Sequence, residues 1–267
     1  MKTRIGICQW SIPVQNAEES LSFAAKLGLE GIEPDLGSYE QDFPLSRKEE
    51  QNKYKIWREN LGIIYPSLAI NALCQYGMSD SGSKKIAELA IAKAVETAAV
   101  LDIPIVQLPS FVKGDIVSGE DFQNTVACLR YACKCAEGIN VIIGSENALT
   151  AEDQLAMIEA VNSKHFKIYF DTRNLFSMKG YDSVRIMEIL LPHICEIHIK
   201  DGIDNGASTL LGKGNSGFFD AMRLLSAYNY TGWLLLENNY AAMSKEIQIP
   251  AEALLREDID TVKSVQS

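Results

Sequence analysis

The chain alternates between short apolar runs and longer amphipathic runs along its whole length, and this alternation is the strongest constraint on its fold. Eight of the runs are almost continuously apolar, as is typical of strands that are buried on both faces of a parallel sheet. These predicted strands are Thr3–Cys8, Gly31–Glu33, Ile63–Leu68, Ile103–Leu108, Asn140–Ser145, Lys167–Asp171, Glu196–Lys200 and Trp233–Glu237.

Helical patterns separate the predicted strands. Their apolar residues recur three and four positions apart, and Gly28, Gly62 and Gly138 follow three of them in the manner of a helix C-terminus. The predicted helices are Ala17–Leu27, Leu45–Leu61, Ser83–Leu101, Asp121–Glu137, Ala151–Val161, Asp182–Leu191, Gly217–Tyr228 and Pro250–Val265.

The number and spacing of these units favour a closed barrel. Eight strand–helix units in 267 residues match the (β/α)₈ barrel, which takes roughly 250 residues. The alternative is a doubly wound open sheet, which usually carries G-x-G-x-x-G after its first strand, whereas Cys8-Gln9-Trp10-Ser11 stands there in this chain. No linker or change of composition marks a boundary. We therefore predict an α/β protein in which residues 1–267 form a single (β/α)₈ TIM barrel domain, an eight-stranded parallel barrel with outer helices.

The composition limits which partners and which cellular compartment we expect for this protein. The net charge is −10 and no basic stripe is visible, so a nucleic-acid partner is not expected. No run approaches the roughly 20 apolar residues of a membrane span, and the first residues, MKTRIGICQW, lack the apolar core of a secretion signal. The six cysteines are interpreted as free thiols in a reducing compartment. A cytoplasmic protein with neither a nucleic-acid nor a membrane partner is the expectation.

Four residues that can bind a metal end four of the predicted strands. They are Glu146 in VIIGSEN, Asp171 in KIYFDTRN, His198 in EIHIKDG and Glu237 in WLLLENN. The carboxyl ends of barrel strands meet at one rim, and three carboxylates with one imidazole suit a hard or borderline divalent ion. Helix capping, a salt bridge or a core histidine are the structural alternatives for each residue taken alone.

This combination indicates a particular chemistry. A divalent ion polarises neighbouring hydroxyl and carbonyl oxygens of a sugar, which lowers the pKa of the adjacent C–H and stabilises an enediolate. Glu146 and Glu237, on the fifth and eighth strands, could flank such a substrate as the catalytic acid–base pair. Two bases on two faces serve an epimerisation, whereas one suffices for a 1,2-isomerisation.

Other polar residues near the strand ends are predicted to contact substrate. Each cation among them could instead be a surface charge or part of an internal ion pair, and the second-strand glutamate could join a hydrogen-bond network. The stretch from Gly212 to Gly217 leads into a predicted helix where barrels often bind phosphate, although a tight turn with a helix cap explains it equally well. The predicted substrate contacts are Glu33, Gln107, Arg173, Asn174, Lys200 and Lys213.

The chain resembles the xylose-isomerase-like TIM barrel superfamily of sugar phosphate isomerases and epimerases. The resemblance rests on GLEGIEP, VIIGSEN, YFDTRN, IHIKDG, LGKGNSGFFDAMRLL and GWLLLEN, and it covers nearly the whole length. It implies one Mn²⁺, Co²⁺ or Mg²⁺ ion, with Zn²⁺ as a further candidate. The implied ligands are Glu146, Asp171, His198 and Glu237.

Departures from the family pattern keep the activity open. Ketose 3-epimerases carry a histidine where Asn174 stands and an arginine near the position of Ser208 or Thr209. The three histidines and the acidic charge do not fit the trizinc endonuclease IV branch. We expect a metal-dependent isomerase or epimerase acting on a small-molecule sugar or sugar phosphate. The alternatives are a metal-dependent dehydratase of a polyol ketone such as an inosose, and a non-catalytic sugar-binding barrel. Barrels of this kind often dimerise through rim loops, so a homo-oligomer is a further expectation.

Overall fold

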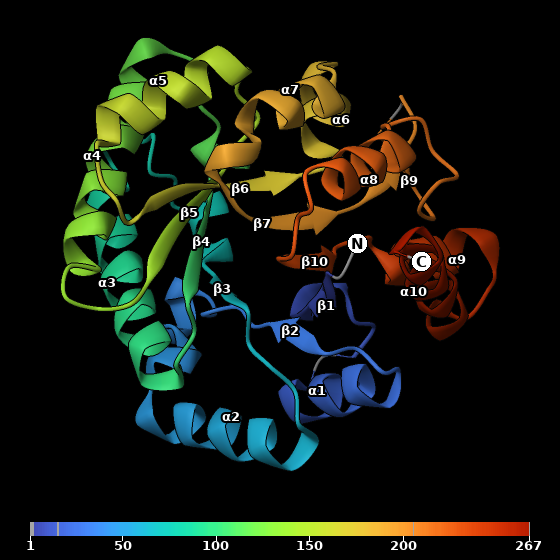
Figure 1. Cartoon of the computed structure of the whole chain (residues 1–267). Coiled ribbons are helices and arrows are strands. Elements are labelled where there is room, and N and C mark those ends of the chain that lie inside the picture. The colour runs from blue at the N-terminus through green and yellow to red at the C-terminus, as the bar shows by residue number, and fades with distance from the viewer. Residues whose placement is uncertain (1–2, 15, 205, 267) are drawn as a thin grey trace.

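The computed structural model describes residues 3–14, 16–204 and 206–266. Within them, eight parallel strands form one sheet in the order β2-β1-β10-β7-β6-β5-β4-β3 (Figure 1). The strands are β1 Arg4–Cys8, β2 Gly31–Glu33, β3 Ser67–Ala69, β4 Ile105–Pro109, β5 Ile142–Glu146, β6 Phe166–Asp171, β7 Ile194–Ile199 and β10 Trp233–Leu236.

Backbone hydrogen bonds between the segments of β2 and β3 close the sheet. The Ile64 amide donates to Glu30 O at 3.0 Å, the Ile32 amide to Ile64 O at 2.9 Å, and the Leu36 amide to Ala69 O at 2.9 Å. Because β2 and β3 stand at opposite ends of the strand order, these contacts turn the sheet into a barrel. The predicted (β/α)₈ fold is confirmed.

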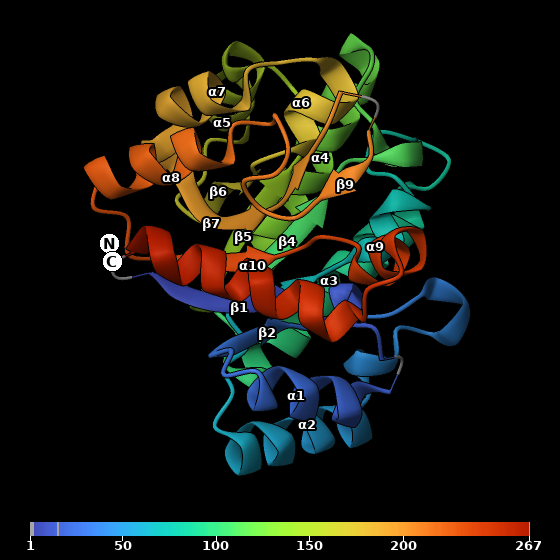
Figure 2. The same cartoon turned by 90° about the vertical axis from the view of Figure 1, so that its right-hand side faces the viewer.

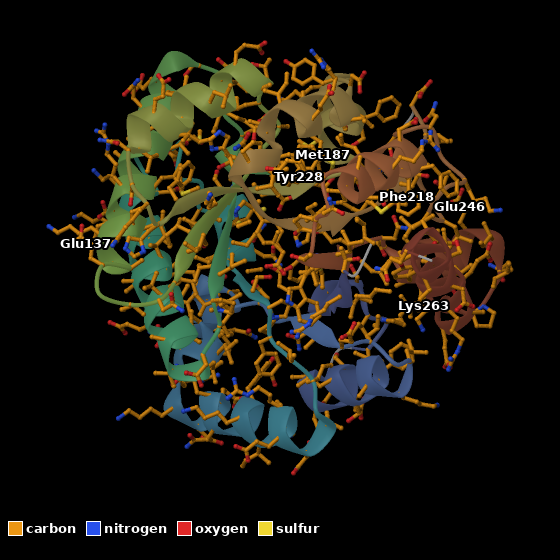
Figure 3. The ribbon with its side chains drawn as sticks, viewed as in Figure 1. Glu137, Met187, Phe218, Tyr228, Glu246 and Lys263 are labelled. Carbon is orange, nitrogen blue, oxygen red and sulfur yellow. The ribbon has the colours of Figure 1, made fainter. Side chains whose placement is uncertain are left out.

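Helices surround the barrel and cover its outer face (Figure 1). Met187 of α7 and Phe218 of α8 are buried, whereas Glu137, Glu246 and Lys263 lie at the periphery (Figure 3). The helices that follow the strands are α1 Ala17–Lys26, α2 Lys48–Leu61, α3 Lys84–Leu101, α4 Gly119–Cys135, α5 Ala151–Val161, α7 Ser183–Leu190, α8 Phe218–Ala227 and α10 Ala251–Gln266.

Local sequence signals set several helix ends. The side chains of Asn16, Ser118 and Thr150 each accept a hydrogen bond from the backbone amide three residues on, which satisfies a donor that the helix itself leaves free. Helix α2 ends at Gly62, whose φ of 64° lies in the left-handed region that glycine adopts without strain.

The structure also contains elements that the sequence pattern did not predict. They are helix α6 Asn174–Lys179, helix α9 Tyr240–Ile247 and an antiparallel pair of short strands, β8 Asp201–Gly202 and β9 Ser208–Thr209. Each follows a barrel strand, and all lie on the same side of the molecule in both views (Figures 1 and 2). Helix α6 and the two strands are too short for a periodic pattern to reveal them. The predicted third strand, Ile63–Leu68, is also shorter, because regular pairing begins only after Pro66, which has no amide hydrogen.

The interior of the barrel contains both apolar and polar side chains. Cys8, Tyr169 and Leu235 form a small apolar cluster there, separate from the main core between strands and helices. Buried polar side chains of several barrel strands also point inward, since alternate residues of a barrel strand face the lumen. These buried polar residues include Glu33, Ser67, Gln107, Glu196 and His198.

The two ends of the described chain lie side by side (Figures 1 and 2). The Gln266 side-chain amide donates to Thr3 O at 3.3 Å, which ties α10 to the start of β1. All six cysteines are free, as the composition predicted. Within the described residues, no helix combines the length and the apolar character needed to cross a membrane.

Candidate active site

Four neighbouring strands bring together the four residues predicted to bind a metal. Strands β5, β6, β7 and β10 are adjacent in the barrel, and they carry Glu146, Asp171 and His198, with Glu237 directly after the last of them. Asp171 and Leu235 are the register partners of His198 on its two sides, so these strand ends lie at one level. One ligand atom from each of the four residues lies within 4.8 Å of the others.

The donor atoms of this cluster fit a divalent metal ion. His198 Nδ1 lies 3.0 Å from Glu237 Oε2 and 3.6 Å from Glu146 Oε2. Among the described residues, His198 Nδ1, Asp171 Oδ2 and Glu237 Oε2 are buried and make no regular hydrogen bond, although the Lys200 ammonium approaches both oxygens. One nitrogen and three carboxylate groups suit Mn²⁺, Co²⁺ or Zn²⁺, and less specifically Mg²⁺.

The other nitrogen of His198 is held by Glu33. Glu33 Oε2 lies 2.7 Å from His198 Nε2, and both side chains are fully buried. Glu33 Oε1 accepts hydrogen bonds from Ser67 Oγ at 2.8 Å and from Tyr169 Oη at 3.2 Å. The prediction that Glu33 contacts substrate therefore has no support in the geometry: its oxygens belong to a hydrogen-bond network below the cluster.

Two predicted substrate contacts hold Glu146 instead. The side-chain amide of Gln107, from β4, donates to Glu146 Oε2, and that of Asn174, from the start of α6, donates to Oε1 at 3.0 Å. The backbone amides of Arg173 and Asn174 donate to Asp171 Oδ1 at 2.8 and 2.5 Å. The first turn of α6 thus orients both carboxylates.

Glu237 has a different set of partners. The indole Nε1 of Trp10, in the turn after β1, donates to Glu237 Oε1 at 3.0 Å, and Lys200 Nζ lies 2.6 Å from Oε2. Lys200 Nζ also lies 3.0 Å from Asp171 Oδ2. Trp10 was not among the predicted site residues, and its position directly after the first strand was the signal that could have identified it.

The protein groups alone place the two glutamates in contrasting environments. Burial raises the pKa of Glu146 above its ordinary value, and the nearby His198 offsets this only in part. Burial acts in the same sense on Glu237, but His198 and Lys200 outweigh it and hold its pKa well below the usual range. Burial opposes the charge of Lys200, yet the carboxylates of Asp171, Glu237 and Glu146 raise its pKa. Two carboxyl groups whose pKa values are shifted in opposite directions, as those of Glu146 and Glu237 are, suit opposite roles in proton transfer.

Two other predicted substrate contacts are not part of the cluster. The Arg173 guanidinium donates to Ser208 Oγ at 3.1 Å and to Gly206 O, and so fastens the β8–β9 pair. Lys213 is exposed and lines a surface pocket of about 280 Å³ beside α9. The Arg173 guanidinium thus contacts the β8–β9 pair, and Lys213 lies in an exposed loop whose pocket is lined by none of the four residues.

The glycine-rich loop around Lys213 closes on an internal carboxylate. Asp201 is buried, and its Oδ2 accepts hydrogen bonds from the amides of Gly212 at 2.9 Å and Gly214 at 3.0 Å. Its Oδ1 accepts one from Ser216 Oγ at 2.7 Å. These donors are the ones a bound phosphate would need, so the tight-turn interpretation of this loop describes the structure better.

Two known proteins of similar sequence are named as an epimerase and a dehydratase. The chain is 29% identical over 246 residues to 2-epi-5-epi-valiolone 7-phosphate 2-epimerase of Actinoplanes sp., covering 90% of this chain and 88% of that protein. It is 24% identical over 157 residues to inosose dehydratase 1 of Bacillus cereus, covering 50% of this chain and 52% of that protein.

Solved structures share the fold. The crystal structure of the IOLI protein with a bound zinc atom superposes with a TM-score of 0.78 at 16% identity, and 98% of each chain is covered. The sequence model of the family described as xylose isomerase-like TIM barrel matches residues 21–265. With a closed eight-stranded barrel and that match over nearly its full length, the chain belongs to the xylose isomerase-like TIM barrel family.

Proposed function

We propose that the protein is a divalent-metal-dependent epimerase or isomerase that acts on the carbonyl group of a sugar or cyclic polyol by proton transfer through an enediolate. The observation that carries this proposal is the cluster of Glu146, Asp171, His198 and Glu237, whose ligand atoms lie within 4.8 Å of one another at the carboxyl end of the barrel. In (β/α)₈ enzymes the chemistry takes place at that end.

The proposed metal ligands are these four residues, with Glu146 and Glu237 also serving as acid and base. A divalent ion bound there would act as a Lewis acid on the substrate carbonyl. One glutamate takes the proton from the carbon next to the carbonyl. The electron pair of that C–H bond forms the C=C bond of the enediolate, and the carbonyl π pair moves to oxygen. The other glutamate returns a proton to the opposite face, which inverts that carbon.

The two glutamates are oriented by different hydrogen-bond donors, which favours separate roles for them as acid and base. Glu146 is oriented by the amides of Gln107 and Asn174, whereas Glu237 is oriented by Trp10 and Lys200. Because none of these four donors contacts both glutamates, each carboxylate can change its protonation state while the donors of the other stay in place. The named relative that matches most of the chain is an epimerase of a phosphorylated cyclic polyol ketone, which supports a ring-shaped substrate.

A dehydratase is the second candidate, and the similarity of half the chain to inosose dehydratase 1 favours it. The first step would be the same removal of a proton next to the carbonyl. The enediolate would then lose hydroxide from the neighbouring carbon, with protonation giving water, instead of regaining a proton.

Deuterium exchange tests the proposal. The Mn²⁺-loaded protein is incubated in D₂O with inososes, cyclic polyol ketones, ketoses and their phosphates, and products are followed by NMR. Deuterium at the carbon next to the carbonyl, together with a new epimer or isomer, is the expected result. An absorbing enone or dione product would instead identify the dehydratase. Glu146→Gln is the inactive control, and absence of exchange with the whole panel contradicts the proposal.

A further inference from the structure

Lys200 is a buried lysine whose position is set from both ends. Its backbone amide donates to Thr172 Oγ1 at 2.9 Å, and the same hydroxyl donates to Lys200 O at 2.8 Å. Its ammonium lies 3.0 Å from Asp171 Oδ2 and 2.6 Å from Glu237 Oε2. A surface lysine samples many rotamers, but here the strand end and two carboxylates restrict the side chain to one location.

The position of Lys200 matters because its positive charge lies among the negative charges of the proposed metal ligands. Glu146, Asp171 and Glu237 contribute three negative charges when ionised, and His198 is neutral when it binds a metal. Lys200 offsets one of these three negative charges, so the four ligands and Lys200 together carry a charge of −2, equal and opposite to that of one divalent ion; the Glu33 carboxylate at His198 Nε2 adds to this charge. Without Lys200, the same ion would leave the site more negative by one charge, and a more negative site disfavours the further negative charge of an enediolate.

We propose that Lys200 is the charge-balancing cation of the metal centre, adjusting the carboxylates to a single divalent ion and stabilising the negative oxygen that develops on the substrate. This inference rests on the proposed function, since it assumes both the metal and the enediolate. Lys200 thereby does more than contact a substrate hydroxyl, because its charge acts on metal affinity and on turnover in opposite directions.

The opposite effects on metal affinity and on turnover distinguish a charge-balancing role of Lys200 from a purely structural one. If Lys200 only held Asp171 and Glu237 in place, its loss would weaken both metal binding and catalysis. If it balances charge, its loss removes a cation that repels the metal, so the metal binds more tightly while the enediolate is less stabilised.

The experiment measures Mn²⁺ binding by isothermal titration calorimetry and substrate deuterium exchange for Lys200→Met. We expect Mn²⁺ to bind about tenfold more tightly, or a second equivalent to bind, while exchange at saturating Mn²⁺ falls about a hundredfold. Lys200→Gln keeps a hydrogen-bond donor without the charge and is expected to follow Lys200→Met. Lys200→Arg keeps the charge and is expected to restore the wild-type affinity for Mn²⁺.

Lys179→Met is the matched control, because Lys179 forms a half-buried ion pair with Asp115 at 2.8 Å on another part of the rim. It is expected to leave Mn²⁺ binding unchanged. Weaker or unchanged Mn²⁺ binding in both Lys200→Met and Lys200→Gln, with wild-type circular dichroism, overturns the inference. Failure of the wild type to bind Mn²⁺ would instead overturn the metal dependence in the proposed function.

Discussion

Glu33 and His198 form a fully buried pair in which Glu33 Oε2 lies 2.7 Å from His198 Nε2. A carboxylate at this nitrogen keeps the proton on Nε2 and leaves the lone pair of Nδ1 directed at the other three residues of the cluster. Ser67 and Tyr169 hold the second oxygen of Glu33, so the ring of His198 is oriented by a chain of contacts from three further strands.

Replacing Glu33 by Gln is therefore expected to weaken Mn²⁺ binding about tenfold to a hundredfold, because the imidazole loses its charged partner. Calorimetric titration with Mn²⁺ measures the effect. Glu196→Gln is the matched control, since Glu196 is also fully buried and lies two residues before His198 on the same strand, but contacts none of the four residues by a hydrogen bond. Equal losses in both variants would show that Glu33 has no special role.

Replacing Trp10 by Phe keeps an aromatic ring at the mouth of the barrel but removes the N–H that donates to Glu237 Oε1. A hydrogen bond to a charged group contributes about 1.5–3 kcal/mol, so we expect the exchange rate to fall at least about tenfold. The Kd for Mn²⁺ should change less, because Oε2 is the atom that faces the cluster. Trp57→Phe, on the outer helix α2, is the control. A wild-type rate in Trp10→Phe would contradict the assigned contact.

Metal binding is expected to stabilise the folded protein. A ligand at about 100 times its Kd adds about 2.7 kcal/mol to the free energy of unfolding. Mn²⁺ should accordingly raise the thermal midpoint of the wild type, and EDTA should reverse the rise. His198→Ala removes the nitrogen ligand and should show no such response. A midpoint that rises equally in wild type and His198→Ala would place the ion elsewhere on the protein.

Asp258 provides a test of pH dependence outside the cluster. It is fully buried in α10 and accepts hydrogen bonds from Asn238 Nδ2 at 2.9 Å and Tyr240 Oη at 2.8 Å. Burial raises its pKa from 3.8 to about 6. Because the folded state holds this proton more tightly than the unfolded state, the associated stability is present below pH 3.8 and is lost as the pH rises through about 6.

Asp258→Asn should remove this pH dependence. Relative to the wild type, the variant should gain about 2.4 kcal/mol of unfolding free energy between pH 4 and pH 7, whatever its stability at pH 4. Urea denaturation across this range measures the difference. A constant difference between the two proteins would show that Asp258 titrates normally in the folded state. Asp260→Asn, at an exposed position of the same helix, is the control.

The sequence by itself determined the barrel and the residues that line its rim. Local hydrophobic patterns predict both the strands buried on two faces and the amphipathic helices. Strand β2 Gly31–Glu33 and helix α5 Ala151–Val161 have the predicted bounds. Since every parallel strand of a barrel ends at the same rim, a strand-end position was enough to predict that Glu146, Asp171, His198 and Glu237 come together.

Only the tertiary structure decided what the neighbouring residues do. Glu33 meets His198 across 165 positions of the chain, and Trp10 meets Glu237 across 227. Arg173 turned out to hold the β8–β9 pair, and Lys200 turned out to lie between two carboxylates. The physical reason is that periodicity reports which way a side chain faces, whereas its hydrogen-bond partner depends on strand register and on short rim segments that carry no periodic signal.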